Sequence, residues 1–273
     1  MPHVLRFKTR GFSGLRNFHA ARSLFHSWLG LLAGLPAWVC MAEEVKESHP
    51  IGVIELFTSQ GCSSCPKADA AIEKIVQSGD VVAISYHIDY WNYLGWQDTL
   101  GARENTDRQY AYARSLGNNN VFTPQIVLNG IQDAKSTNPA VILSDLKRMS
   151  ENGDGVPVDV DADLTKDEMT ISVGAGAGKA DVVMAYFKKA TTVEIAKGEN
   201  TGKKITYRNA VTKLETVGMW DGKAMTIKLP AALISKKGQD GCAILVQAHD
   251  KDGNPGRIYG AAILENYGTL GAH

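Results

Sequence analysis

The sequence predicts an α/β domain built on a mixed β-sheet, followed by a β-rich, sandwich-like domain. Three observations lead to this prediction. Strand and helix patterns alternate over residues 50–152, and a C-x-x-C pair, Cys62 and Cys65, stands where the first strand turns into the first helix. From residue 156 to residue 270 the pattern is almost entirely that of strands.

The first 42 residues have the pattern of an export signal. An apolar run, Trp28–Val39, follows a basic segment, and no acidic residue precedes Glu43. This run is shorter than the roughly 20 residues that a membrane-spanning helix needs. We therefore expect a signal peptide over residues 1–42 and a periplasmic or secreted protein. A lipoprotein modified at Cys40 and an uncleaved anchor are the alternatives. The basic residues are Arg6, Lys8, Arg10, Arg16 and Arg22.

Removal of this signal changes the charge of the chain. The whole chain has 29 basic and 29 acidic residues, and without the signal 24 basic and 29 acidic residues remain, a net charge of −5. No basic patch is present, so we expect no nucleic-acid partner. We also expect no stable membrane insertion after the signal is cleaved.

The first half alternates between strands and helices. Ile51–Phe57 and Val81–Ile88 have the apolar pattern of strands buried on both faces. Cys62–Val76 lies between them with apolar residues at helical spacing and Pro66 in its first turn. This order predicts a parallel strand pair. An aromatic and helical insertion at about residues 90–117 follows, and it forms either a wall for a substrate or packing for the second domain.

The end of the first half predicts a hairpin and a helix. Thr123–Pro124 precedes an apolar run that is broken by Asn129–Gly130, and Asn-Gly is a strong hairpin signal. Asn138 then caps a helix that has Pro139 at its first position.

The second half predicts eight short strands, several of which alternate apolar and polar residues, as in an antiparallel sandwich or sheet. They are Val158–Ala162, Met169–Val173, Asp181–Lys188, Thr192–Ile195, Ile205–Asn209, Met225–Leu229, Cys242–Ala248 and Arg257–Leu264.

The C-x-x-C pair is the strongest chemical signal in the chain. A cysteine at a helix N-terminus is stabilised as a thiolate by unpaired N–H groups and the helix dipole. Cys62 would then be the nucleophile, and Cys65, one turn further on, the resolving thiol. A purely structural disulfide is one alternative. Half of a zinc site is another, but no second cysteine or histidine pair accompanies it.

The order of strand, C-x-x-C helix, strand, helix, proline-led hairpin and helix resembles the thioredoxin superfamily in its short form. Three segments narrow the resemblance: Val53–Pro66, His87–Trp96 and Thr123–Gln125. They are similar to a family of secreted bacterial proteins known as a domain of unknown function (family twelve twenty-three), over about residues 50–264. This resemblance implies a thioredoxin-like fold and export, and it implies no particular substrate.

The resemblance also implies roles for individual residues. Pro124 would be a cis-proline that faces the dithiol, and Thr123 would lie beside the disulfide. Glu55 would relay protons to Cys65, as an acid in that region does in thioredoxins. A solvated or salt-bridged strand acid is the other interpretation of Glu55.

Five further residues are candidates for substrate contact: Ser63, Ser64, His87, Tyr90 and Trp91. The serines stand between the cysteines, and the aromatic residues would bind an extended peptide or pack in the core. A copper site of Cys62, Cys65 and His87 is a further alternative. We otherwise expect no metal and no cofactor. Cys242 reads as a buried hydrophobic residue.

The function that the sequence favours is that of an exported thiol–disulfide oxidoreductase acting on protein or small thiol substrates. Two alternatives remain, a non-catalytic binding module with a structural disulfide and a periplasmic copper-binding protein. The direction of exchange depends on the reduction potential, which the sequence does not set.

Overall fold

Two apolar runs form the parallel strand pair that the sequence predicts. The computed structural model describes residues 49–234 and 239–265, so the predicted signal peptide at 1–42 lies outside the described residues. Strands β1 (Val53–Thr58) and β2 (Val82–His87) are parallel and buried throughout. Helix α1 (Pro66–Ser78) joins them and ends at Gly79, which has a left-handed conformation.

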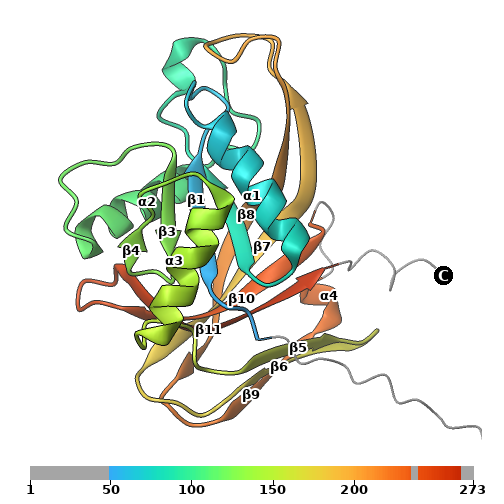
Figure 1. The fold of residues 1–273 in the computed structure, drawn as a ribbon. Helices are drawn as coiled ribbons and strands as arrows, with labels where there is room; N and C mark the ends of the chain where they lie inside the picture. The colour runs from blue at the N-terminus through green and yellow to red at the C-terminus, as the bar shows by residue number, and fades with distance from the viewer. Residues whose placement is uncertain (1–48, 235–238, 266–273) are drawn as a thin grey trace, which may run out of the picture. The chain divides into compact units, whose positions relative to one another are not determined.

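The remaining elements give a mixed α/β fold with one large and one small sheet (Figure 1). The large sheet has the order β11-β10-β7-β8-β2-β1-β3-β4, and the small sheet has the order β5-β6-β9. The other helices are α2 (Arg103–Ser115), α3 (Pro139–Glu151), the one-turn α4 (Ala231–Ile234) and the 3-10 helix η1 (Asn92–Leu94). The other strands are β3 (Gln125–Leu128), β4 (Gln132–Asp133), β5 (Val160–Leu164), β6 (Glu168–Val173), β7 (Ala180–Glu194), β8 (Lys204–Trp220), β9 (Met225–Pro230), β10 (Gly241–His249) and β11 (Pro255–Glu265).

The two faces of β1 and β2 are covered differently. One face packs against α1 and α3 in a cluster that includes Ile54, Ile72 and Leu146 (Figure 1). The other face packs against α2 and against side chains of β7, β10 and β11, in a cluster that includes Phe57 and Tyr112. Residues of β1 therefore alternate between two separate cores.

The second half of the chain extends the large sheet instead of building only sheets of its own. Strands β7, β8, β10 and β11 lie in the same sheet as β1–β4, so the described residues do not confirm a separate second domain. The junction is narrow, because β2 and β8 pair in parallel at Ser85 and Ala210. The small sheet packs on the far part of the large one through a third cluster, which includes Ile171, Trp220 and Ile244.

Two local predictions differ from the structure in their bounds. The helix predicted over Cys62–Val76 begins only at Pro66, because proline favours the first helical position and Cys62–Cys65 form a turn before it. The predicted strands at 181–188 and 192–195 are one 15-residue strand, β7, and β8 extends to 17 residues where only 205–209 were predicted. These two strands make a long hairpin, which positions its tip far from the small sheet.

Turn and cap predictions are confirmed. Asn129 and Gly130 both have positive φ, 48° and 73°, as a hairpin turn of this kind requires. The side chain of Asn138 accepts a hydrogen bond from the Ala140 N–H at the start of α3, and Pro139 holds the first helical position. Within 49–234 and 239–265, no helix is both long and apolar enough to cross a membrane.

Candidate functional site

Cys62 and Cys65 form a disulfide at the entrance to α1. Their Cα atoms lie 5.4 Å apart. Cys65 is the N-cap residue of α1, and its carbonyl accepts hydrogen bonds from the N–H groups of Ala68 and Asp69. Cys62 is 2% exposed and Cys65 is fully buried. Cys65, and not Cys62 as predicted, therefore stands at the helix N-terminus, with Cys62 in the turn before it, and neither cysteine presents much surface.

A loop with a cis-proline lies beside this disulfide. The Thr123–Pro124 peptide bond is cis, as the resemblance implied. The Ser64 hydroxyl donates to the Thr123 carbonyl at 3.4 Å and lies 3.4 Å from Cys62 Sγ. The indole N–H of Trp91 donates to Thr123 Oγ1 at 2.8 Å. The structure therefore brings Cys62, Ser64, Trp91 and Thr123 together.

The surface around the disulfide is made of hydroxyl and aromatic side chains. Ser63 and Ser64 are exposed. Tyr93 is 77% exposed and stacks on Trp91 with ring centroids 6.3 Å apart, and Phe122 is 47% exposed. Tyr90 is partly buried against the core cluster that contains Tyr112. The aromatic insertion therefore contributes both to the core and to the surface next to the dithiol.

The tip of the β7–β8 hairpin covers the other side of the dithiol turn. The side-chain amide of Asn200 donates to the carbonyls of Gln60 and Cys62, at 2.9 and 2.8 Å. Asn200 and Gln60 are both fully buried. Figure 1 shows this orange tip beside the segment that leads from β1 into α1. Access to the disulfide is therefore restricted on the hairpin side.

His87 lies beneath this turn and not at the surface. Its Nδ1 lies 2.8 Å from Asp98 Oδ2, and both side chains are fully buried. Asp98 also accepts the N–H groups of Gln60 and Leu100 at 2.8 Å. Burial raises the pKa of Asp98, but the charge of His87 and these hydrogen bonds outweigh that effect and hold the pKa below its usual value. The pair thus anchors the loop before Cys62, and direct substrate contact by His87 is not supported.

Asp69 is a second buried acidic group, one helical turn after Cys65 on α1. Thr58 donates its hydroxyl to Asp69 Oδ1 at 2.9 Å. Within the described part of the chain, Asp69 Oδ2, His87 Nε2 and the Tyr207 hydroxyl have no hydrogen-bond partner. Burial raises the pKa of Asp69 to about 7, although the charge of His87 and the Thr58 hydrogen bond lower it. Asp69 can therefore exchange a proton near neutral pH.

Glu55, the predicted proton relay, lies on the opposite face of β1. Its Oε1 accepts two hydrogen bonds from Arg108, at 2.7 and 2.9 Å, and its Oε2 accepts one from the Tyr112 hydroxyl. Gln247 of β10 bonds to both Arg108 and Tyr112. Glu55 therefore links β1, α2 and β10 on the face away from α1, and a relay to Cys65 gains no support.

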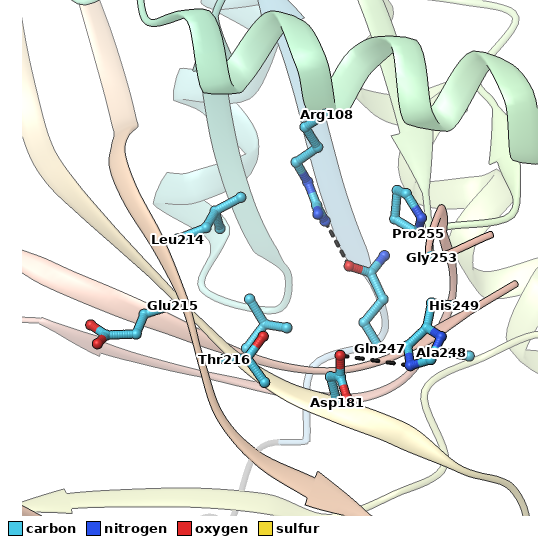
Figure 2. A pocket seen from close by; sticks show the side chains of 11 residues that line it. Arg108, Asp181, Leu214, Glu215, Thr216, Gln247, Ala248, His249, Gly253 and Pro255 are labelled. Atoms are coloured by element: carbon cyan, nitrogen blue, oxygen red, sulfur yellow. Dashed lines mark hydrogen bonds and ion pairs between the residues drawn. The ribbon is translucent and has the colours of Figure 1, made fainter. Parts of the chain in front are cut away.

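A pocket of about 400 Å³ opens over that same face (Figure 2). Arg108 and Gln247 bond to each other in it, and His249 lies 3.7 Å from Asp181. None of the eleven lining residues is a residue that the sequence predicted for the site. Dashed lines in Figure 2 join Arg108 to Gln247 and His249 to Asp181, and neither Cys62 nor Cys65 lines this pocket.

The copper alternative gains no support from the geometry. Among residues 49–234 and 239–265, no group of three or more His, Cys, Asp and Glu side chains could hold a metal ion. Cys62 and Cys65 are joined to each other, and Nδ1 of His87 bonds to Asp98.

Sequence reasoning missed Asp69, Asp98 and Asn200. Asp69 left a signal, because it stands on the apolar stripe of α1 at helical spacing from Cys65 and Ile72, where a charged residue is unusual. Asp98 and Asn200 left none, since their contacts with the dithiol loop, to Gln60 and Cys62, span 38 and 138 residues of sequence.

The fold and the site together define a mixed α/β protein with a C-x-x-C disulfide beside a cis-proline loop. The chain belongs to the DUF1223 family of proteins of unknown function, whose family model matches residues 53–247.

Two solved structures are similar to this chain. The crystal structure of protein AGR_C_4864 from Agrobacterium tumefaciens is 48% identical, with a TM-score of 0.75 and coverage of 82% of this chain and 98% of that one. HBP35 of Porphyromonas gingivalis is 18% identical, with a TM-score of 0.57 and coverage of 80% and 76%, and this likeness concerns the fold alone. No curated protein matches the chain.

Proposed function

We propose that this protein is an exported thiol–disulfide oxidoreductase with a thioredoxin-like site, and that it works in the periplasm or outside the cell on a thiol or disulfide protein partner. The observation that carries the proposal is the contact between the Cys62–Cys65 turn and the cis-proline loop, which Ser64 bridges to Thr123. A structural disulfide alone does not require a neighbouring loop of this kind. The signal-like segment 1–42 supports export.

In the proposed reaction the Cys62 thiolate attacks a substrate disulfide and forms a mixed disulfide with one substrate sulfur. The other substrate sulfur leaves as a thiolate. Cys65 then attacks Cys62 Sγ, which closes the Cys62–Cys65 disulfide and releases the second substrate thiolate. The reverse sequence oxidises a substrate dithiol.

Cys65 must lose its proton before it attacks, and Asp69 is the group that we assign to this step. Cys65 is buried, and burial in apolar surroundings disfavours a thiolate. Asp69 lies one helical turn after Cys65 and donates its main-chain N–H to the Cys65 carbonyl, and its pKa of about 7 suits proton exchange with a thiol near neutral pH. Glu55 lacks this access because Arg108 and Tyr112 hold both of its oxygens.

The test is the reduction potential of the disulfide in the mature protein. The protein is equilibrated with glutathione or dithiothreitol redox buffers, its free thiols are alkylated, and its mass is measured. A potential between roughly −120 and −270 mV, the range of known exchange catalysts, supports the proposal and indicates the direction of exchange. A potential below roughly −300 mV, with cysteines that resist reduction in the native state, contradicts it.

Two variants separate the cysteine roles in the same assay. Cys65→Ala should accumulate a mixed disulfide with a peptide substrate, because the resolving thiol is absent. Cys62→Ala should form none. Asp69→Asn should retain mixed-disulfide formation but slow its resolution at neutral pH, since the proton acceptor of Cys65 is lost.

The burial of both cysteines favours a second candidate function, a binding module with a structural disulfide. In this interpretation the exposed rings of Tyr93 and Phe122, next to Trp91, hold the partner. The potential measurement decides between the two functions, because a structural disulfide gives the lower value and no mixed disulfide in Cys65→Ala.

A further inference from the structure

The Ser64 hydroxyl stands between two acceptors and has one proton to give. It lies 3.4 Å from the Thr123 carbonyl and 3.4 Å from Cys62 Sγ. In the disulfide neither sulfur carries a proton, so Ser64 is the donor in both contacts. The side chain is exposed, so no packing prevents the hydroxyl from rotating between the two acceptors.

The Thr123 carbonyl differs from the other polar groups of its loop. Thr123 Oγ1 is held by the Trp91 indole at 2.8 Å, and the Phe122 carbonyl is held by the Gln109 side chain at 2.7 Å. Pro124 has no N–H. Among residues 49–234 and 239–265, Ser64 is the one donor to the Thr123 carbonyl. Among the acceptors of this loop, the Thr123 carbonyl is therefore the one whose hydrogen-bond donor, Ser64, can move away without disturbing the core.

The redox state of Cys62 changes the balance between these acceptors. A disulfide sulfur is a weak hydrogen-bond acceptor, whereas a thiolate carries a full charge, and hydrogen bonds to charged groups are roughly twice as strong as neutral ones. Reduction by dithiothreitol transfers two electrons and breaks the S–S bond. Cys65 leaves as a thiol, Cys62 as a thiolate, and the dithiothreitol closes to its cyclic disulfide. The Ser64 proton then has a stronger acceptor at Cys62 than at Thr123.

We infer that Ser64 is a redox-dependent hydrogen-bond switch that caps the Thr123 carbonyl in the disulfide form and releases it when Cys62 becomes a thiolate. The resemblance to the thioredoxin superfamily implies that the main chain beside Pro124 pairs with a substrate polypeptide, and the switch frees the Thr123 carbonyl for that pairing only when Cys62 is reduced. Ser64 then stabilises the nucleophile in the same state in which the loop can bind substrate.

This arrangement favours one direction of exchange. The reduced protein binds the polypeptide, and closure of the Cys62–Cys65 disulfide returns Ser64 to Thr123 and lowers the affinity for the product. That order suits a protein that reduces disulfides in polypeptide substrates. The part of the inference that concerns substrates rests on the proposed function, whereas the movement of the hydroxyl does not.

The sequence allows a direct measurement on this carbonyl. Thr123–Pro124 is the single Thr-Pro dipeptide in the chain, so ¹³C-carbonyl threonine together with ¹⁵N-proline labels one doubly labelled peptide bond. A carbonyl that loses a hydrogen bond moves upfield. We expect the Thr123 signal of the full chain to move upfield on reduction, in wild type and in the matched control Ser63→Ala. In Ser64→Ala it should already lie upfield in the disulfide form and stay there on reduction.

A second readout follows the thiolate itself. In the reduced chain, Ser64→Ala should slow the alkylation of Cys62 at mildly acidic pH by about tenfold, because the Cys62 thiolate loses a hydrogen-bond donor. Ser63→Ala should leave the rate unchanged, and Ser64→Thr, which keeps a hydroxyl, should restore it. Restoration by Ser64→Thr separates the hydroxyl from a general effect of the substitution on folding.

Two results would overturn the inference: a Thr123 signal that does not respond to reduction in wild type, or one that responds equally in Ser64→Ala. Failure of the proposed function looks different. If the reduction potential lies below roughly −300 mV while the Thr123 signal still follows the redox state, the switch stands and the catalytic function fails. If the potential lies in the catalytic range and the signal does not move, the function stands and the switch fails.

Discussion

Two buried acids on opposite sides of β1, Glu55 of the strand itself and Asp69 of α1, are in opposite situations. Glu55 faces α2, where Arg108, Tyr112 and Gln247 bond to it or to one another. Asp69 lies on α1, against the other face of β1, where one of its oxygens has no hydrogen-bond partner and its pKa is about 7. A buried acid that is neutralised by a fixed cation holds elements together, whereas one without a dedicated cation can exchange a proton. Glu55 therefore has a structural role on its side of β1, whereas Asp69 is available for proton transfer on the other side.

Removal of the cation on the Glu55 face should have the largest effect. Arg108→Met leaves the buried Glu55 carboxylate without its charge partner, and breaking a buried pair in this way costs about 3–5 kcal/mol. Urea unfolding measures the loss. Arg103→Met, which removes an exposed pair with Asp107, should cost less than about 1 kcal/mol. If Arg108→Met also changed the reduction potential of the Cys62–Cys65 disulfide, the role of the Glu55 face would not be structural alone.

On the other side of β1, Asp69 should make the free energy of unfolding depend on pH. Because folding raises the pKa of Asp69 from 3.8 to about 7, the folded state favours the protonated acid. Its contribution to stability is full below the unfolded pKa and is lost as the pH rises through about 7. Asp69→Asn stays neutral, so wild type should become less stable than the variant by roughly 2–4 kcal/mol across this window. Equal pH profiles in urea unfolding would show that Asp69 is not poised in this way.

The tip of the β7–β8 hairpin should control access to the disulfide on the α1 side of β1. Asn200→Ala removes two hydrogen bonds from the carbonyls of Gln60 and Cys62. At about 1 kcal/mol each, their loss should speed the reduction of the disulfide by dithiothreitol roughly ten- to thirtyfold. Thr201→Ala, one position further along the tip, is the control. If both variants react at the wild-type rate, the tip does not restrict access.

The smallest effect is expected at Trp91. Trp91→Phe keeps an aromatic ring but removes the indole N–H that donates to Thr123 Oγ1. The loss should be about 1 kcal/mol in urea unfolding. Tyr93→Phe, on a ring that is 77% exposed, should leave the free energy of unfolding unchanged. A larger loss in this variant would show that Tyr93, and not Trp91, anchors the loop.

Local chemistry was predictable from the sequence where the residues that matter lie close together. The dithiol turn, Pro66 at the start of α1, the Asn129–Gly130 turn and the Asn138 cap each depend on a few adjacent residues. The cis state of Thr123–Pro124 followed only from the resemblance to a family, because the dipeptide alone carries no such signal.

What the sequence did not reveal depends on contacts between distant segments. β8 was predicted over only five of its residues, because its later part mixes apolar and charged residues without clear alternation and is fixed by pairing with β7. The face that Glu55 occupies was not predictable, since alternation along a strand says which residues share a face but not which helix covers it. Asn200 lies in a polar hairpin tip, where a buried amide has no sequence signature.

The hydrogen bond between Asn200 and Cys62 also limits how early the site can be completed during synthesis. The two residues are 138 positions apart, so at about 5–20 residues per second the ribosome adds Asn200 roughly 7 to 28 s after Cys62. For that interval both cysteines belong to a nascent chain that has no cover for them. The two cysteines are thus uncovered while the polypeptide grows, and the hairpin tip covers them only in the folded protein.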